Sequence, residues 1–293
     1  MKLEEALEEY LIELKVKKLS PQTQDSYKGK LTAFVNSIGV KNLEDVKPIH
    51  IKEYILKRQE ANVKANSINT ELRIISGMFN YFIDEYEDEE IIDSNPCMLK
   101  GKMKTRRLKE SKKVMKAFSE EDVEELYNLY KGKGYFDVRN KTILMVFAET
   151  GIRMTELFTI EMKDVSDNRI LIHGKGDKER YVPISSRLKK QLLKYERARK
   201  KFMSNEDQKS SAYFVSKHKK KFGKRGLQQV AKDINGTIDI EGCFHNFRRY
   251  FAVKKYLETR DIYRVRDLLG HSDVVVTQRY VNSIDKELVL GME

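Results

Sequence analysis

The feature that most constrains the fold of this chain is a strongly basic segment in its first half. Residues 97–116 contain nine Lys or Arg against one acid, Glu110. Such a run stays solvated, because burying unpaired charges is costly. A chain of 293 residues also exceeds the roughly 100–200 residues of one domain. We therefore predict a first domain at residues 1–95, a basic linker at 96–117 and a second domain at 118–293.

Apolar residues recur at helical spacing through the first domain. A first amphipathic helix is predicted by Leu3, Leu7, Tyr10, Leu11 and Leu14. Ser20-Pro21 is typical of a helix start, with serine as the N-cap and proline at the first helical position. Apolar periodicity predicts three further helices across residues 27–35, 49–55 and 68–82. The first domain is thus predicted to be a small helical bundle.

The second domain is predicted to be mainly helical with a small β-hairpin. Ser119 and Asp122 match a capping box, so the domain begins near Phe118. Alternating apolar stretches at 169–173 and 180–184 surround a Gly/Asp turn, which is typical of a hairpin. A short further strand is predicted at residues 213–215. The fold class is α+β, mainly α.

Four short motifs carry side chains suited to phosphoryl chemistry. Arg153 and Arg248 offer planar guanidinium forks that can each bind two phosphate oxygens. Glu156 follows Arg153 by three residues, and His245 precedes Arg248 by three, so each pair shares a helix face. The remaining motifs are the hairpin turn Gly174-Lys175-Gly176 and the run from Leu268 to Tyr280, which contains His271. Taken singly, each motif also fits a solvated arginine, a surface lysine or a half-buried tyrosine.

In order and spacing, the four motifs together resemble the tyrosine site-specific recombinases, the integrase family that includes the Xer proteins. Two positions depart from the family pattern: Phe247 stands where leucine is usual, and Arg249 where histidine is common. Neither position carries the chemistry. The resemblance extends loosely over residues 3–90, where the bundle is similar to the family's DNA-clamping domain, and specifically over 148–281. It implies a two-domain DNA clamp.

The resemblance also implies a role for each residue. Tyr280 is the nucleophile that forms a 3′-phosphotyrosyl bond, and Arg153 and Arg248 hold the scissile phosphate, with Glu156 in support. His271 donates a hydrogen bond to a non-bridging oxygen, and neutral His245 accepts the tyrosine proton. Lys175 is the general acid for the 5′-oxygen, and Lys178 in the same turn is the alternative. One phosphodiester replaces another, so no cofactor is expected. The acids are scattered, so no metal site is expected.

The charge of the chain favours nucleic acid as the partner. The formal net charge is +12, which suits binding to a polyanion, although a lysine-rich proteome would also produce it. The basic linker is either a spacer or a row of phosphate contacts ordered by DNA. The predicted DNA-binding residues are Lys102, Lys104, Arg106 and Arg107 in the linker, and Lys219, Lys220 and Lys221 in a second basic loop.

Family resemblance implies double-stranded DNA as substrate and a homotetramer on two DNA sites, exchanging strands through a Holliday junction. Because the clamp begins at residue 3, we expect a Xer-like enzyme that resolves dimers. Integration or excision of a virus or plasmid is the alternative, and relaxation of DNA by a type IB topoisomerase is a further one. Cys97 and Cys243 form no C-x-x-C pair, and no long apolar span occurs, so a cytoplasmic enzyme with no membrane contact is expected.

Overall fold

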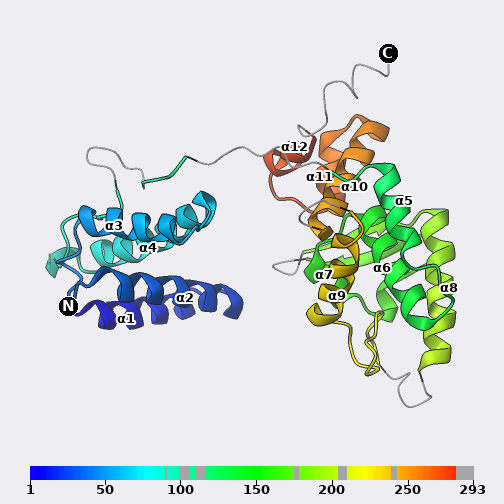
Figure 1. The fold of residues 1–293 in the computed structure, drawn as a ribbon, viewed down its shortest axis with the longest axis horizontal. Helices are drawn as coiled ribbons and strands as arrows, with labels where there is room; N and C mark the ends of the chain where they lie inside the picture. Colours follow the sequence, from blue (N-terminus) through cyan, green and yellow to red (C-terminus); the bar gives the residue numbers. More distant parts are fainter. Residues whose placement is uncertain are drawn as a thin grey trace. The chain divides into compact units, whose positions relative to one another are not determined.

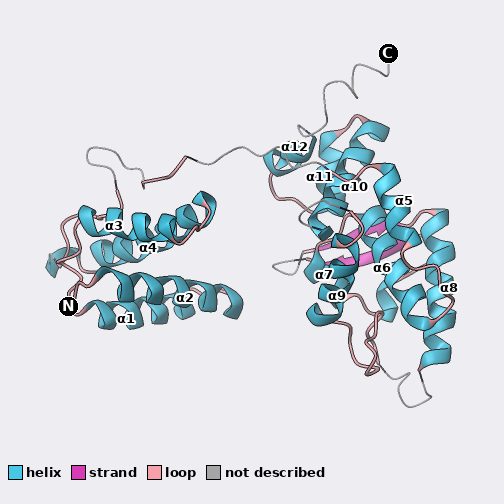
Figure 2. Cartoon of the chain, in the orientation of Figure 1, coloured by secondary structure: helices cyan, strands magenta, loops and turns pink. Residues whose placement is uncertain are grey.

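The chain forms two compact units, Met1–Lys113 and Val114–Glu293, in the computed structural model. The ribbon is mostly helical, with one small sheet in the second unit (Figures 1 and 2). This confirms the predicted fold class. No helix in the described part of the chain is long and apolar enough to cross a membrane. The structure describes residues 1–89, 91–98, 106–109, 117–174, 178–203, 210–238 and 243–281.

The first unit is a bundle of four helices. These are α1 (Leu3–Val16), α2 (Pro21–Ile38), α3 (Pro48–Glu60) and α4 (Ala65–Glu85), followed by the short 3₁₀ helix η1 (Glu87–Glu89). The Ser20 hydroxyl accepts a hydrogen bond from the Thr23 N–H at 3.3 Å, which caps α2 as the sequence predicts. Leu31, Phe34 and Phe79 lie in a core to which all four helices contribute.

Residues 106–109 of the predicted linker pack on the first unit. The Asn69 side chain donates to the Leu108 carbonyl at 3.0 Å and accepts from the Leu108 N–H at 2.7 Å. The Arg106 N–H donates to the Cys97 carbonyl at 2.9 Å. The first compact unit accordingly extends past residue 95, where the sequence predicts its end.

The second unit begins with the expected capping box. The Asp122 N–H donates to the Ser119 hydroxyl, and the Ser119 N–H donates to the Asp122 carboxylate. The elements that follow are α5 (Glu120–Asn128), α6 (Tyr135–Thr150), α7 (Met154–Thr159), η2 (Met162–Asp164), β1 (Arg169–His173), β2 (Glu179–Pro183), α8 (Ser186–Phe202), α9 (Lys224–Asn235), α10 (Cys243–Thr259), α11 (Ile262–Leu269) and α12 (Val274–Val281).

The two strands form the predicted antiparallel hairpin, which lies beside α7 and α11 (Figure 2). In its register Ile170 faces Val182, and Ile172 faces Arg180. The Gly174 N–H donates to the Lys178 carbonyl at 2.7 Å at the base of the turn. Because opposed residues of an antiparallel pair share one face, Arg180 lies on the buried face of this sheet.

The further strand predicted at residues 213–215 is wrong. This segment makes only isolated bridges, Ala212 with Glu161 and Val215 with Lys221. The rings of Tyr213 and Phe214 are both buried and lie 5.4 Å and 5.1 Å from the Tyr195 ring. Consecutive strand residues point to opposite faces, so two successive rings packed on one helix exclude a regular strand.

Candidate active site

Most of the residues predicted from the four motifs come from elements that pack together in the second unit. α10 and α11 both pack on α12, and β2 lies beside α11 (Figure 1). Arg153 immediately precedes α7, His245 and Arg248 lie on α10, His271 follows α11, and Tyr280 lies on α12.

Arg153 is held at the start of α7 by the carboxylate three residues later. The Arg153 N–H and Nη1 donate to Glu156 at 2.7 Å and 2.8 Å. Its Nη2 donates to the Gly270 carbonyl at 3.2 Å. The Arg153 side chain is nevertheless 41% exposed, whereas that of Glu156 is 4% exposed. A guanidinium has five N–H donors, so this orientation leaves donors of Arg153 for an incoming anion.

Arg248 is almost fully buried and spans two chain segments. Its Nη1 donates to the Gly151 carbonyl and its Nη2 to the Leu269 carbonyl, both at 2.6 Å. Gly151 ends α6 in the left-handed conformation, with φ at 60°. A Cβ there would lie 2.4 Å from the Phe251 ring, so this position requires glycine. The Thr-Gly of the motif therefore supplies a carbonyl that orients Arg248.

The phenol of Tyr280 contacts the imidazole of His245. Tyr280 Oη lies 3.1 Å from His245 Nε2, within hydrogen-bond distance. The His271 ring centroid is 5.6 Å from that of Tyr280, and the Arg249 guanidinium lies 6.0 Å from the same ring. Tyr280 is 8% exposed and is packed among Phe251, Ala252, Val265 and Leu269. The packing fixes the phenol beside a base.

Thr277 orients His271 and was not predicted from the sequence. His271 Nδ1 lies 2.8 Å from the Thr277 hydroxyl, which is fully buried. Thr277 lies three residues before Tyr280, so both side chains occupy one face of α12. That shared spacing is the sequence signal that could have identified it.

Arg180 is the second residue that sequence reasoning missed. Its Nη1 and Nη2 donate to the two oxygens of Glu156 at 3.0 Å and 2.8 Å, and its Nε donates to the Leu268 carbonyl at 2.9 Å. The available signal was the alternation of β2, which places Arg180 on the same buried face as Val182. An arginine at an inward-facing strand position needs an anionic or carbonyl partner.

Burial and neighbouring charge set the protonation of the site. Burial, followed by the charge of Arg153, lowers the pKa of Arg248 to about 10, so it is charged at neutral pH. Burial raises the pKa of Glu156, but hydrogen bonds from Arg180 and the Arg153 N–H outweigh it and hold the value at about 2. The site therefore carries ionised guanidinium groups around one ionised carboxylate. Among the described residues, no group of three or more His, Cys, Asp or Glu could hold a metal ion.

Both histidines of the site are neutral at pH 7. Burial lowers the pKa of His245, and the charges of Arg249, Arg248 and Arg153 add to the shift. Burial lowers the pKa of His271 to about 4, and the charges of Arg248, Arg153 and Arg180 contribute. A neutral imidazole can accept a proton from a phenol, as the prediction for His245 requires.

The hairpin turn that carries the predicted general acid is described only at its base. Lys175 lies outside the described residues, and the alternative, Lys178, is described and exposed. At the end of β1, His173 lies between two carboxylates, with Nε2 3.2 Å from Asp164 and Nδ1 2.9 Å from Glu179. Lys175 therefore stays the predicted general acid, with Lys178 as the alternative.

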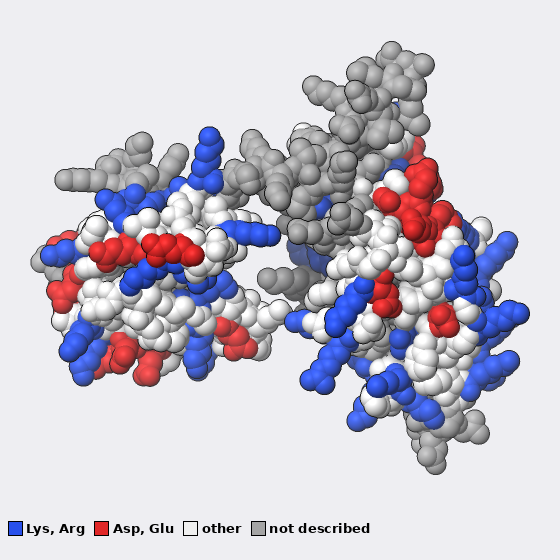
Figure 3. All heavy atoms as spheres, in the orientation of Figure 1, with Lys and Arg blue, Asp and Glu red and all other residues white. Residues whose placement is uncertain are grey.

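The predicted DNA-binding residues fall in three places. Lys102 and Lys104 lie outside the described residues, whereas Arg106 and Arg107 belong to the segment on the first unit. The second basic loop, with Lys219, Lys220 and Lys221, turns just before α9, and the last two of these lysines are exposed. Lys and Arg side chains are spread over the visible surface of both units and mixed with acidic ones (Figure 3).

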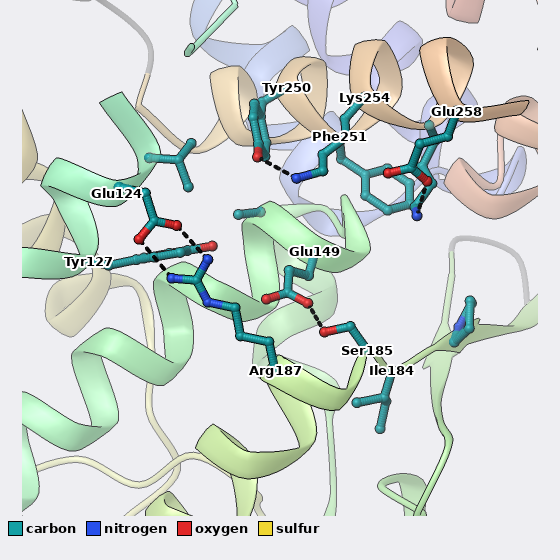
Figure 4. A pocket seen from close by; sticks show the side chains of 14 residues that line it. Glu124, Tyr127, Glu149, Ile184, Ser185, Arg187, Tyr250, Phe251, Lys254 and Glu258 are labelled. Carbon is teal, nitrogen blue, oxygen red and sulfur yellow. Dashed lines mark hydrogen bonds and ion pairs between the residues drawn. The ribbon is translucent and has the colours of Figure 1, made fainter. Parts of the chain in front are cut away.

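A pocket in the second unit lies apart from the predicted catalytic residues. It is lined by α5, α6, the start of α8 and the face of α10 that carries Tyr250, Lys254 and Glu258 (Figure 4). Its polar side chains are paired with one another, such as Arg187 with Glu124 and Lys254 with Tyr250. None of the predicted site residues lines it. α10 thus presents its motif residues on one face and the pocket on another.

Comparison with family models and curated proteins matches both units. Residues 102–287 match the phage integrase family, and residues 6–88 match the phage integrase N-terminal SAM-like domain. The chain is 27% identical to the tyrosine recombinase XerC of Bacillus pumilus over 257 residues, covering 85% of this chain and 81% of XerC. It is 27% identical over 288 residues to XerD of Halalkalibacterium halodurans, covering 94% and 92%.

Solved structures share the fold at low sequence identity. The XerH recombinase bound to a palindromic difH substrate has a TM-score of 0.74 and 17% identity, covering 97% of this chain and 82% of XerH. The lambda integrase tetramer bound to a Holliday junction has a TM-score of 0.72 and 15% identity, covering 96% and 77%. The Tn1549 integrase bound to transposon end DNA has a TM-score of 0.73 and 14% identity, covering 99% of both chains.

Proposed function

The chain belongs to the phage integrase family and is a tyrosine recombinase, and from this premise we propose that its DNA strand cleavage and rejoining proceed through Tyr280. The observation that carries the proposal is the 3.1 Å contact between the Tyr280 phenol and His245. A free phenol has a pKa near ~10, so it needs a base or a cationic site to attack at neutral pH. The second unit supplies both: His245 is the base, and Arg153 and Arg248 form the cationic site.

In the proposed cleavage step, Arg153 and Arg248 bind non-bridging oxygens of the scissile phosphate. Tyr280 Oη attacks phosphorus, and its proton passes to neutral His245. The bond from phosphorus to the 5′-oxygen breaks as the 3′-phosphotyrosyl bond forms. The leaving oxygen takes a proton from the general acid, Lys175 or the alternative Lys178. Rejoining reverses these steps with the 5′-hydroxyl of a second strand, so the phosphodiester energy is conserved.

His271 supports the transition state as a neutral donor. Its pKa of about 4 excludes the charged form at neutral pH, and Thr277 lies within hydrogen-bond distance of Nδ1. When the threonine hydroxyl donates to Nδ1, the ring proton resides on Nε2, which can donate to a non-bridging phosphate oxygen. Glu156 does not react in this scheme but holds Arg153 in place.

A recombinase needs DNA and further copies of itself as partners. We propose that the helical first unit and the basic residues between the units clamp double-stranded DNA, and that four copies assemble on two sites. The tetrameric lambda integrase on a Holliday junction and the DNA-bound XerH share this fold. The XerC and XerD relatives favour a Xer-like role in resolving DNA dimers in the cytoplasm, with integration of a mobile element as the alternative.

A nicked suicide substrate tests the nucleophile. Tyr280→Phe removes one oxygen and leaves the ring packing intact, so DNA binding stays within about twofold while covalent protein–DNA adduct is lost. The matched control is Tyr263→Phe, because Tyr263 lies on α11 and is 59% exposed. The adduct is measured by denaturing gel electrophoresis. An adduct in Tyr280→Phe would disprove the assignment, and Tyr250 and Tyr256 would be tested next.

A further inference from the structure

Arg180, Arg153 and Arg248 donate hydrogen bonds to three successive backbone carbonyl groups. Arg180 Nε donates to Leu268 O, Arg248 Nη2 to Leu269 O, and Arg153 Nη2 to Gly270 O, at 2.9, 2.6 and 3.2 Å. The arginines come from β2, α10 and the start of α7, and the carbonyls form the C-terminal end of α11. Cations are favoured there, because the last carbonyls of a helix have no partner within it. His271 directly follows Gly270, the last residue whose carbonyl is bound in this way.

Arg180 differs from Arg153 in how its donors are used. All three nitrogens of the Arg180 guanidinium donate to protein acceptors, and its side chain is 13% exposed. Arg153 is 41% exposed. The backbone also makes room for Arg180: Gly270 has φ at +63°, and a Cβ there would lie 3.1 Å from Arg180 Nη1. Arg180 is therefore fixed against the protein, while Arg153 faces outward.

We propose that Arg180 is a positioning residue for strand cleavage: it neutralises Glu156, so that the charge of Arg153 remains available to the scissile phosphate. This role rests on the proposed function of Arg153. Glu156 receives two hydrogen bonds from Arg180 and two from Arg153. Three guanidinium groups and one carboxylate leave an excess of two positive charges. Without Arg180, Arg153 alone would compensate the buried carboxylate, and the attraction for phosphate would fall.

The same contacts give Arg180 a second effect, on geometry. Strand β2 follows the turn that contains Lys175, and Arg180 pairs with Ile172 next to the end of the hairpin. Arg180 therefore links this hairpin to Glu156 on α7 and to the backbone that carries His271. A loss of this link shifts the phosphate ligands relative to one another, and small misplacements of reacting groups cost on the order of 100-fold in rate.

The test compares Arg180→Ala and Arg180→Lys with Arg169→Ala in the full-length enzyme. Arg169 lies on β1, is exposed and stacks on Tyr181, so it is a matched arginine of the same sheet outside the site. We expect Arg180→Ala to slow single-turnover cleavage of saturating suicide substrate on the order of 10- to 100-fold, with Arg169→Ala unchanged. Arg180→Lys keeps the charge without the fork and falls between the two. It also serves as the folded variant if Arg180→Ala is unstable.

Two readouts separate this role from general stabilisation. The double variant Arg180→Ala/Glu156→Gln has no uncompensated carboxylate, so it should cleave faster than Arg180→Ala at pH 7. Burial raises the pKa of Glu156 and the hydrogen bonds from Arg180 lower it, so without Arg180 the carboxylate is protonated at a higher pH than in wild type. The defect of Arg180→Ala should therefore shrink as the pH falls. A double variant as slow as Arg180→Ala, with a defect independent of pH, would overturn the proposal that Arg180 acts by neutralising Glu156.

The proposed function and the Arg180 role can fail separately. If Tyr280→Phe still forms the adduct, the nucleophile assignment fails whatever Arg180 does. If Tyr280→Phe is inactive and Arg180→Ala cleaves like Arg169→Ala, only the positioning role fails.

Discussion

Among the described residues, each unit contains one buried carboxylate held by arginine, and the two carboxylates differ in how much positive charge surrounds them. In the first unit, Glu71 accepts from Arg58 Nε and Nη2 at 2.9 Å and 2.6 Å and from the Tyr54 hydroxyl at 2.9 Å. One guanidinium meets one carboxylate. In the second unit, Glu156 accepts from both Arg153 and Arg180, and Arg248 shares the same helix end.

The difference separates a structural contact from the site that we propose for the scissile phosphate. The pair in the first unit is neutral, and it joins α3 to α4, two helices of one bundle. The cluster in the second unit keeps an excess of positive charge, and one of its arginines is 41% exposed. Excess guanidinium charge with outward donors suits phosphate, whereas a balanced pair has no excess charge to attract an anion.

The largest expected effect comes from removing one arginine from each unit. Arg248→Ala should slow cleavage about 1,000-fold, because charge stabilisation is the main contribution of a protein to phosphoryl transfer. Arg58→Ala should leave cleavage by folded protein nearly unchanged and lower the free energy of unfolding by about 1–3 kcal/mol, because Glu71 loses its charged partner. Single-turnover cleavage and urea denaturation measure the two effects. Equal losses of cleavage rate in both variants would contradict the conclusion that only the arginines of the second unit act on the phosphate.

A smaller effect is expected from removing each carboxylate charge. Glu156→Gln should slow cleavage about 10-fold, since Arg153 loses its anchor, and Glu71→Gln should not. The folded-state pKa of Glu156 is about 2, below the ordinary 4.5, so its charge stabilises the fold fully above pH 4.5. That contribution is lost as the pH falls through 2. The stability gap between wild type and Glu156→Gln should therefore be constant from pH 7 to 4.5 and narrow below it.

The smallest effect is a shift in histidine titration. Positive charge around Glu156 resists protonation of His271, whose pKa is lowered to about 4, first by burial and then by the arginines. His173 faces Asp164 and Glu179 instead, and its hydrogen bond to Asp164 raises its pKa above the ordinary 6.5. NMR titration should therefore place the two on opposite sides of 6.5.

The sign of each linkage follows from these directions. Neutral His271 stabilises the fold above pH 6.5, and this is lost as the pH falls toward 4. Protonated His173 stabilises it below pH 6.5, and this is lost as the pH rises through its raised pKa. Arg180→Ala should raise the pKa of His271, and Arg58→Ala should leave it unchanged. If the pKa of His271 shifted equally in both variants, the excess positive charge around Glu156 would not be its cause.

Local sequence spacing was sufficient for several elements and for grouping the candidate site residues into motifs. The cap at Ser20, the capping box at Ser119 and the hairpin around Gly174 each depend on residues within a few positions of one another. The segment at 213–215 was mispredicted because its apolar run fits a strand or a buried loop equally well. Only the position of the Tyr195 ring on α8 distinguishes the two.

The sequence by itself determined which side chains share a face of one element, such as His245 with Arg248, because a helix repeats every 3.6 residues whatever surrounds it. It could not show that the Tyr280 phenol reaches His245, or that Arg180 joins Arg153 on Glu156. Those contacts join segments far apart in the chain. Their distances depend on how α7, β2, α10, α11 and α12 pack, and packing is decided by the whole buried core rather than by any local pattern.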